Sequence, residues 1–251
     1  MNVFLTGATG FIGQHVARCL TRQGHTHTSE LPYDVGIHLA WYVEPGKYLE
    51  SPLNDKCRDD SLALVKSVRC PRWVVAGTCF EVSPTTRYAR CKRELFLALE
   101  QLGIELAWPR LFYLYGPHEH PRRFVPTVIN ALLQSRHAPL TSGDEVRDFL
   151  HVEDVAEALC AVATSTLTGI INLGSGQPVT VREVATEIAG IIGRPDLLRF
   201  GAYQSAPSDP LRIVADVAKL NAIWRPRISL ADGLRATIEW WRQQPPRDQA
   251  S

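Results

Sequence analysis

Short apolar runs and amphipathic stretches alternate along the first half of the chain. Residues 2–6 form an apolar run that ends at a glycine, and apolar residues then recur with helical spacing between residues 11 and 23. The same alternation continues and predicts strands at 2–6, 25–29, 35–40, 73–76 and 104–108 and helices at 11–23, 54–68 and 87–102. Strands that alternate with helices are typical of βαβ units around a parallel sheet.

The second half of the chain continues with helical patterns and fewer strands. Helices are predicted at 124–133, 152–163, 179–192 and 230–241, and a strand at 170–173. Loops rich in Pro, Gly and Ser separate these elements, without an internal repeat or a low-complexity linker. The predicted fold class is therefore α/β.

The composition is that of an ordinary globular chain. Of 251 residues, 45% are hydrophobic and 21% are charged, which suits one large domain or two interlocked ones. Positive and negative side chains nearly cancel, with 27 Lys and Arg against 26 Asp and Glu. No overall basic field therefore favours binding to nucleic acid or to an anionic membrane, and an anionic ligand would have to be bound locally.

Cysteine placement and the first residues bear on the cellular compartment. The six cysteines are scattered without a CxxC pair or metal-ligand spacing, which favours reduced thiols and a cytoplasmic protein. The first residues lack the basic start and long apolar run of a signal peptide, and no stretch approaches the roughly 18 apolar residues of a membrane helix. We expect neither export nor membrane insertion.

A glycine-rich turn lies where the first predicted strand meets the first predicted helix. Gly7 would permit the tight turn, Gly10 a close approach of the backbone to a phosphate, and Gly13 close packing of helix on strand. Free N–H groups and the helix dipole at such a turn attract the pyrophosphate of a dinucleotide. The spacing differs from the GxGxxG fingerprint, so a glycine turn that binds no ligand is the alternative.

The adenine end of such a site has weaker support. A dinucleotide fold usually has a charged residue about 20 positions further on that contacts the ribose 2′ position. Glu30 could accept the 2′-hydroxyl there, or it could be merely solvated. The sequence therefore does not decide between NAD and NADP.

Tyr88 and Lys92 lie four residues apart at the start of a predicted helix and so share one helical face. A phenol with a pKa near 10 must lose about three units to exchange protons efficiently at neutral pH, and a nearby cation supplies about one to three. Lys92 and the cationic ring of an oxidised nicotinamide together would supply this change. Thr78, directly after a predicted strand, could hydrogen-bond the same substrate oxygen, or could be an ordinary strand-end threonine.

With these residues in view, the sequence resembles the extended short-chain dehydrogenase/reductase family, in particular its NAD-dependent epimerase/dehydratase branch, which modifies nucleotide sugars. The resemblance covers nearly the whole chain, in the order TGATGFIG from Thr6, HLA from His38, AGTCFEV from Ala76, YARCK from Tyr88, PRLFYLYGP from Pro109, RDFLHVEDVAEAL from Arg147, INLGSGQPVTV from Ile171 and DPLRIVADVAKL from Asp209. It implies a Rossmann-like doubly wound parallel sheet with a smaller C-terminal substrate-binding region. Residues 1–116 would form the cofactor-binding region, with 145–173 returning to it, and 117–251 mainly the region that binds the sugar nucleotide.

The resemblance also implies roles for individual residues. Tyr88 would be the catalytic acid and base, Lys92 would hold the nicotinamide ribose and lower the tyrosine pKa, and Thr78 would orient the reacting oxygen. The residues implied to bind the cofactor, NAD or NADP, are Gly7, Thr9, Gly10, Phe11, Ile12, Gly13, Glu30, Leu39, Ala40, Lys92 and Pro109. Those implied to bind the nucleoside-diphosphate sugar are Thr78, Cys79, Phe80, Glu81, Tyr113, Arg147 and Arg212.

Two of the implied substrate residues are arginines, and both have an alternative role. Arg147 and Arg212 would grip the diphosphate, which suits guanidinium geometry. Arg147 could instead form an internal salt bridge to Asp148 or Asp154, and Arg212 could form a surface ion pair.

The family often forms homodimers through a four-helix bundle, and the corresponding helices here are those at 54–68 and 87–102. Four apolar side chains could form its seam or could equally belong to the core: Leu62, Val65, Leu95 and Leu99.

Several positions depart from the family pattern. The stretch from the glycine loop to Tyr88 is short, so that an element of the adenine half is missing. Family dehydratases have two acidic residues after the active threonine, whereas Cys79 and Phe80 stand here, with Glu81 as a possible auxiliary acid. Tyr113 and Val82 replace a usual Asn and a usual Tyr, which makes the sugar pocket atypical. Dehydration is disfavoured.

We therefore expect an NAD(P)-dependent oxidoreductase that moves a hydride to or from C4 of a nucleoside-diphosphate sugar, either by reducing a 4-keto sugar or by epimerising C4 through a transient ketone. A non-catalytic nucleotide-sugar or dinucleotide binding protein is the alternative. Three further features are expected to be structural: His118-Glu119-His120 as an exposed loop with no metal, Asp59-Asp60 as a solvated helix face, and Trp240-Trp241 as packing or an interface.

Overall fold

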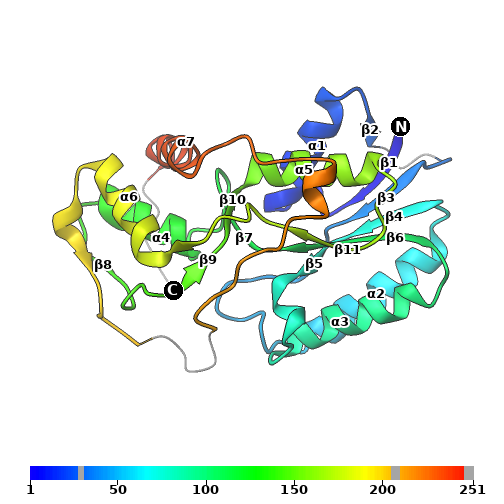
Figure 1. Ribbon diagram of the computed structural model, residues 1–251, viewed down its shortest axis with the longest axis horizontal. Helices are drawn as coiled ribbons and strands as arrows, with labels where there is room; N and C mark the ends of the chain where they lie inside the picture. Colours follow the sequence, from blue (N-terminus) through cyan, green and yellow to red (C-terminus); the bar gives the residue numbers. More distant parts are fainter. Residues whose placement is uncertain (28–30, 205–209, 246–251) are drawn as a thin grey trace.

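The computed structural model describes residues 1–27, 31–204 and 210–245, and its centre is a parallel sheet (Figure 1). The sheet has seven strands in the spatial order β11-β6-β4-β3-β1-β2, with β5 paired to the end of β6. Their bounds are β1 Asn2–Thr6, β2 Thr26–His27, β3 Val35–His38, β4 Arg72–Val75, β5 Gly77–Thr78, β6 Glu105–Leu111 and β11 Gly169–Leu173. All pairings within it are parallel, which confirms the predicted Rossmann-like α/β fold.

Burial explains why the central segments form strands. All four residues of β3 and all four of β4 are buried, as expected for strands that helices cover on both faces. A Cβ atom at Gly36 of β3 would lie 2.6 Å from the Trp73 ring on β4, so the close approach of these strands requires glycine. Open sheets of this kind bind ligands at the carboxyl ends of their strands.

Two pairs of helices cover the faces of the sheet (Figure 1). α1 (Phe11–Arg22) and α5 (Val152–Thr164) pack together on one face, and α2 (Leu53–Ser67) and α3 (Arg87–Glu100) pack together on the other. Each pair buries an apolar cluster against the sheet.

The cluster under α2 and α3 decides between two interpretations of the apolar side chains on these helices. Val65, Leu95 and Leu99 are buried within the chain, and Leu62 packs against the same cluster. They therefore belong to the core, and an assembly through these helices would have to use their exposed side chains, such as Leu97.

A smaller layer of helices lies beside the sheet (Figure 1). It contains α4 (Phe124–Leu133), α6 (Val181–Ile192) and α7 (Leu230–Arg242), which enclose an apolar cluster of their own. Short strand pairs connect this layer: β7 (Tyr113–Tyr115) with β10 (Phe149–His151), β9 (Val146–Arg147) with β12 (Val179–Thr180), and β8 (Ala138–Pro139) with β13 (Leu198–Arg199).

Predicted boundaries agree with the structure to within two residues, except at one strand. The strand predicted to end at Trp108 continues to Leu111, because β6 pairs with β11 through Pro109, opposite Ile171. At the helix predicted from residue 179, α6 begins after Thr180, which caps it in a reciprocal capping box with Glu183.

The sheet is short on its β1 side. β2 pairs with β1 at two positions, and no strand lies beyond it in the part of the chain that the structure describes. This agrees with the missing element inferred for the adenine half. Glu30 lies outside the described residues.

Two further predictions concern the acidic pair on α2 and the helices as possible membrane spans. Asp59 and Asp60 are exposed on α2 and pair with Arg58 and Lys56, as predicted for a solvated helix face. Within the described ranges, the helices lack the combined length and apolar character that crossing a membrane requires.

Candidate active site

The backbone of the glycine loop between β1 and α1 packs closely against neighbouring backbone. Gly7 has a φ of 72°, and a Cβ atom there would lie 2.8 Å from the Ala40 nitrogen. At Gly13 a Cβ atom would lie 1.9 Å from the Gly7 carbonyl oxygen, so only glycine lets α1 pack against the loop. Gly10, at the N-cap of α1, has no side chain that could accept a hydrogen bond from the first N–H groups of the helix. These N–H groups therefore suit the phosphates of a dinucleotide.

A pocket of about 1100 Å³ joins this loop to the smaller helical layer. Among the residues predicted for the site, it brings together Gly7, Thr9, Gly10, Phe11, Ile12, Gly13, Leu39, Ala40, Thr78, Cys79, Phe80, Tyr88 and Tyr113. Five other predicted residues do not line it: Glu81, Lys92, Pro109, Arg147 and Arg212. The glycine loop and the tyrosine, which are about 80 residues apart in the sequence, thus share one cavity.

Tyr88 lies at the start of α3 and is buried beside Thr78. Its ring packs edge-on against Tyr48, with centroids 5.0 Å apart, and against Trp41 at 6.3 Å. Burial raises the pKa of Tyr88, and a hydrogen bond with Thr78 offsets this only in part. The expected lowering of the tyrosine pKa therefore does not occur in the chain alone, and Tyr88 is held as a neutral phenol.

Lys92 lies one helical turn beyond Tyr88 and its ammonium is engaged by the protein. Nζ donates a hydrogen bond of 2.7 Å to the Ala76 carbonyl and lies 3.8 Å from the centroid of the Trp41 ring. Burial lowers the pKa of Lys92 to about 7, although the carboxylate of Glu81 acts in the opposite direction. In the chain alone, burial therefore disfavours charge on Lys92 as well as on Tyr88.

The residues directly after Thr78 form a 3₁₀ turn, Cys79–Val82, that begins with a cap. Thr78 Oγ1 accepts a hydrogen bond from the Phe80 N–H. Phe80 lines the pocket edge-on to Tyr113, with centroids 6.2 Å apart. Burial raises the pKa of the Cys79 thiol to about 12, so this side chain is uncharged at neutral pH.

Glu81 points away from the pocket into the sheet. Its Oε1 accepts a hydrogen bond of 2.7 Å from the Trp108 indole and a second from the Arg110 guanidinium. Burial raises the pKa of Glu81 in spite of the arginine. Its role as an auxiliary acid at the substrate finds no support here, because its partners hold it behind the pocket wall.

The two predicted diphosphate-binding arginines lie next to each other outside the pocket wall. The backbone of Arg212 pairs with that of Val146, which places it beside Arg147. Arg147 is buried, and its Nη1 donates to the carbonyls of Pro210 at 2.8 Å and Leu211 at 3.3 Å.

Neither proposed acidic partner of Arg147 is free. Asp148 accepts from the N–H groups of Ser175, Gly176 and Ala215, and Asp154 accepts from those of Arg227 and Ile228. Hydrogen bonds with the backbone thus occupy Arg147, Asp148 and Asp154, for which the sequence suggested internal salt bridges. Pro109, predicted to contact the cofactor, is buried within β6, and the pocket wall begins at Leu111.

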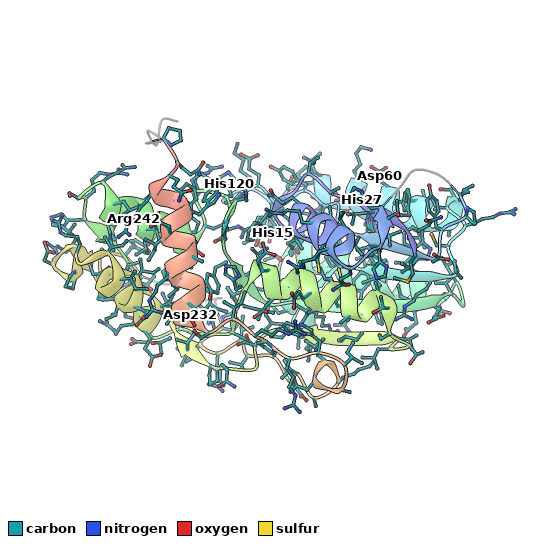
Figure 2. All side chains as sticks on the ribbon, turned by 90° about the horizontal axis from the view of Figure 1, so that it is seen from above. His15, His27, Asp60, His120, Asp232 and Arg242 are labelled. Atoms are coloured by element: carbon teal, nitrogen blue, oxygen red, sulfur yellow. The ribbon has the colours of Figure 1, made fainter. Side chains whose placement is uncertain are left out.

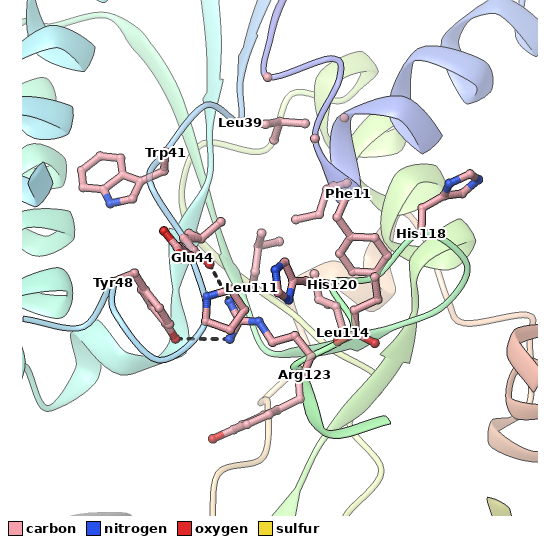
Figure 3. Close-up of a pocket in the computed structure, with 18 of the residues that line it drawn as sticks. Phe11, Leu39, Trp41, Glu44, Tyr48, Leu111, Leu114, His118, His120 and Arg123 are labelled. Atoms are coloured by element: carbon pink, nitrogen blue, oxygen red, sulfur yellow. Dashed lines mark hydrogen bonds between the residues drawn. The ribbon is translucent and has the colours of Figure 1, made fainter. Parts of the chain in front are cut away.

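Sequence reasoning missed the residues that connect the sheet to the helical layer across the pocket. Arg122 and Arg123 lie just before α4 and contact residues 43–48, and we call these contacts the arginine clasp. Arg123 donates to the Val43 carbonyl at 3.3 Å, and its guanidinium lies 5.0 Å from the Tyr48 ring centroid (Figure 3). Arg122 forms an ion pair of 3.2 Å with Glu44. The neighbouring arginines before a predicted helix were the signal that could have indicated them.

The loop at residues 118–120 also differs from its prediction. His118 and His120 are exposed, but Glu119 is 7% exposed, and all three line the pocket. The His118 ring lies 4.7 Å from that of Trp240, and His120 lies between α7 and α1 when the molecule is seen from above (Figure 2). The expected exposed loop is therefore wrong for Glu119, whereas the packing role expected of Trp240 and Trp241 is seen in the cluster between α4, α6 and α7.

Comparisons with known proteins agree with this fold. Residues 76–174 match the profile of the NAD dependent epimerase/dehydratase family. The chain is 34% identical to GDP-L-fucose synthase 1 of Arabidopsis thaliana over 51% of its own length and 43% of the relative. It is 24% identical to UDP-glucuronic acid decarboxylase 1 of Xenopus tropicalis, over 96% of this chain and 72% of that one. The match to the NAD dependent epimerase/dehydratase family therefore lies in the middle of the chain, at residues 76–174.

Solved structures share the fold over nearly the whole chain. The structure of TunA, an NAD dependent-NDP-hexosamine 5,6-dehydratase, has a TM-score of 0.85 and 26% identity and covers 98% of this chain and 99% of that one. UDP-glucose 4-epimerase of Thermus thermophilus, in complex with NAD, shares the fold with a TM-score of 0.83 at 23% identity, over 97% and 99% of the two chains. The chain spans less than half the length of the first curated relatives it matches, at 43% and 49% of the Arabidopsis thaliana and Homo sapiens proteins.

Proposed function

We propose that the protein is an NAD(P)-dependent oxidoreductase that moves a hydride to or from C4 of a nucleoside-diphosphate sugar, as a C4 epimerase or a 4-keto reductase. One observation carries the proposal: the glycine loop and the Tyr88–Thr78 pair line a single pocket of about 1100 Å³. That volume lies slightly above the roughly 300–1,000 Å³ of a pocket for one small ligand, as two ligands side by side would require.

The named relatives support the substrate class. GDP-L-fucose synthase, dTDP-D-glucose 4,6-dehydratase and UDP-glucuronic acid decarboxylase all carry a nucleotide sugar in their names. NAD is present in the name of the TunA structure and in that of the Thermus thermophilus complex, which supports the cofactor class.

The cofactor, when bound, would supply the hydride. The first turn of α1 would hold its pyrophosphate through backbone N–H groups, with Leu39 and Ala40 along the same wall. During reduction the Tyr88 hydroxyl would give its proton to the C4 oxygen and become a phenolate, and during oxidation the phenolate form would take the proton of the C4 hydroxyl. Thr78, hydrogen-bonded to Tyr88, would hold that oxygen in line with the phenol.

Dehydration is the second candidate, because the TunA structure is that of a 5,6-dehydratase. The residues after Thr78 weigh against it. Cys79 is an uncharged thiol, Phe80 has no acidic group, and Glu81 is bound to Trp108 and Arg110 behind the pocket wall. A non-catalytic binding protein is the third possibility, and the shortened sheet edge at β2 is the observation in its favour.

Cofactor content separates these possibilities. The purified protein is denatured, any released nucleotide is identified by mass spectrometry, and intact protein is titrated with NADH and NADPH. Retained NAD supports an epimerase, and an empty protein that binds NADPH supports a reductase. A protein that binds neither contradicts the proposal and favours the non-catalytic alternative, and a sugar product lighter by one water would identify a dehydratase.

A further inference from the structure

Four aromatic rings line the pocket next to the proposed reaction centre, and we call them the aromatic row. Phe80 packs edge-on against Tyr113, with ring centroids 6.2 Å apart. The Phe149 ring lies 5.8 Å from that of Tyr113 and 5.9 Å from that of Phe124. All four belong to the pocket lining, and together they carry one hydroxyl group and no charge. This part of the lining is therefore largely hydrocarbon.

The order of the strands places the aromatic row on the sugar side of the reaction centre. Neighbouring strands run in the order β1, β3, β4 and β6, and their carboxyl ends meet at one edge of the sheet (Figure 1). Along this edge the glycine loop follows β1, Ala40 lies beyond β3, Thr78 beyond β4 and Tyr113 beyond β6. A cofactor held at the glycine loop would reach Tyr88 from the β1 side. The aromatic row lies past that point and is therefore left for the sugar.

Packing within the protein agrees with this assignment. Three members of the row, Tyr113, Phe124 and Phe149, pack in the apolar cluster of the smaller helical layer. The glycine loop belongs to the sheet and contributes no residue to that cluster. The row thus continues from the reaction centre toward α4.

Phe80 is the member of the row next to the reaction centre. Its N–H donates a hydrogen bond of 3.4 Å to Thr78 Oγ1, which holds the residue at the start of the 3₁₀ turn. The Phe80 side chain is partly exposed and lines the pocket, so a bound ligand can contact it. Cys79 beside it is an uncharged thiol, and Glu81 is held behind the pocket wall. A substrate group next to the reacting oxygen therefore meets an apolar surface.

Charged residue types line other parts of the pocket. Among the described residues of the lining they are Glu44, Glu119 and Arg123, and none comes from the segments 77–80 and 111–114 around the reaction centre. A polar substituent placed against the Phe80 ring would lose water without gaining a hydrogen bond from that ring, which costs free energy.

The chemistry of a hexose limits which substituent suits such a surface. The two neighbours of the reacting C4 are C3, which carries a hydroxyl or amino group in most hexoses, and C5, which carries C6. C6 is a hydroxymethyl group in an ordinary hexose and a methyl group in a 6-deoxyhexose. Of these substituents, only the methyl group can be buried against an aromatic ring without losing a hydrogen bond.

We propose that Phe80 determines sugar specificity by selecting nucleotide sugars that carry a methyl group at C5, which are 6-deoxyhexoses. This inference rests on the proposed function. It agrees with the residue types of Cys79 and Phe80, because a 6-deoxy sugar has no C6 hydroxyl to eliminate and requires no acid at these positions.

Matched pairs of nucleotide sugars test the selection in the unmodified protein. UDP-glucose, dTDP-glucose and GDP-mannose are each paired with the nucleotide sugar that lacks only the C6 hydroxyl. The full-length protein is titrated calorimetrically with both members of each pair and with NADH. In a pair whose nucleotide the protein binds, the 6-deoxy member should bind about tenfold more tightly, because an apolar surface disfavours an added hydroxyl.

Two substitutions at residue 80 test whether its ring makes the distinction. Phe80→Asn offers hydrogen bonds to a C6 hydroxyl, whereas Phe80→Leu keeps an apolar surface. Val82→Asn, at an exposed position of the same 3₁₀ turn, is the matched control. Phe80→Asn should reduce the difference within a pair to about twofold or less. Phe80→Leu and Val82→Asn should keep it within about threefold of the unmodified protein, and NADH affinity should stay the same in all three.

Other results would overturn the inference in distinguishable ways. Equal affinity of the unmodified protein for both members of a pair would refute the selection, and the proposed function, which concerns C4, would stand. A full preference retained by Phe80→Asn would assign the selection to another residue, and weaker NADH binding by this variant would assign Phe80 to the cofactor. If no nucleotide sugar bound the unmodified protein, both this inference and the proposed function would be wrong.

Thermal unfolding shows which variants are folded before they are titrated. If Phe80→Asn does not fold, the comparison within each pair still decides the selection, because it uses the unmodified protein. Phe80→Leu then tests the ring, since a preference that it lost would contradict an apolar contact at this position.

Discussion

The ammonium of Lys92 lies 3.8 Å from the centroid of the Trp41 indole, directly over its ring. Trp41 is itself fixed, because its Nε1 donates a hydrogen bond of 2.8 Å to Asn54, which donates in turn to the Tyr48 carbonyl at 2.6 Å. The ring favours the charged amine, whereas burial disfavours it. The balance leaves Lys92 close to half-protonated at neutral pH, with a pKa of about 7.

This lowered pKa predicts a pH-dependent stability. Unfolded Lys92 would have a pKa near 10.4, so between about pH 7 and pH 10 the unfolded state binds more protons and the protein gains stability as the pH rises. The stability of Lys92→Met lacks this term, so the unmodified protein should gain on the variant as the pH rises. Thermal unfolding at pH 7, 8.5 and 10 measures the difference, with Lys66→Met at an exposed position of α2 as the control. A difference that is constant over this range would refute the shifted pKa.

Removal of the Tyr88 hydroxyl should stop turnover and leave binding intact. A positioned acid or base contributes about 10²–10⁴ in rate, so Tyr88→Phe should lose at least two orders of magnitude in kcat. Its affinity for the nucleotide sugar should change by less than about twofold, because the ring still packs against Tyr48 and Trp41. Tyr203→Phe, at an exposed tyrosine, serves as the control. A fully active Tyr88→Phe protein would rule out the proton-transfer role.

Glu81→Gln separates a structural role from an acid role. The substitution removes the charge that pairs with Arg110 and leaves an acceptor for the Trp108 indole. Breaking a buried pair of this kind costs roughly 3 kcal/mol, so the free energy of unfolding in urea should fall by about that amount. The rate of the folded variant should be unchanged. A slower enzyme of normal stability would instead restore Glu81 as an auxiliary acid.

Two glycine substitutions should have opposite effects. At Gly13 a Cβ atom would lie 1.9 Å from the Gly7 carbonyl oxygen, and the obstructing atoms are backbone, so Gly13→Ala must displace α1 or the loop. It should lower stability by several kcal/mol and abolish NADH binding. Gly190→Ala, in α6 with nothing within 4 Å of the added atom, should raise stability by about 0.5–1 kcal/mol. Equal stabilities of the two variants would contradict the packing described here.

The parts of the molecule that local pattern determines could be predicted from the sequence. The strands and helices around the sheet follow from apolar periodicity, and the conformations of Gly7 and Gly13 follow from a turn that joins a strand to a helix. The Tyr88–Lys92 spacing likewise fixes a shared helical face, but not what surrounds it. The neutral state of Tyr88 and the lowered pKa of Lys92 come from burial under Trp41 and Tyr48, a segment about 40 residues away in the sequence.

Long-range partners account for the other differences. Arg147 donates to carbonyls 63 and 64 residues further along, and Glu81 accepts from side chains 27 and 29 residues away. Charge alone suggested Asp148 or Asp154 as partners of Arg147, whereas tertiary packing supplied backbone carbonyls. Glu119 shows the same limit, because a glutamate between two histidines and two prolines has the pattern of an exposed loop, whereas the folded chain buries it in the lining of the pocket.

The arginine clasp has a kinetic consequence. The side chains of Arg122 and Glu44 are 48% and 35% exposed, and ion pairs at such exposure contribute less than about 1 kcal/mol. A contact of that strength is broken on the order of 15% of the time or more. The Arg122–Glu44 pair can therefore open and close while the Arg123 contacts with Val43 and Tyr48 still hold the sheet to the helical layer.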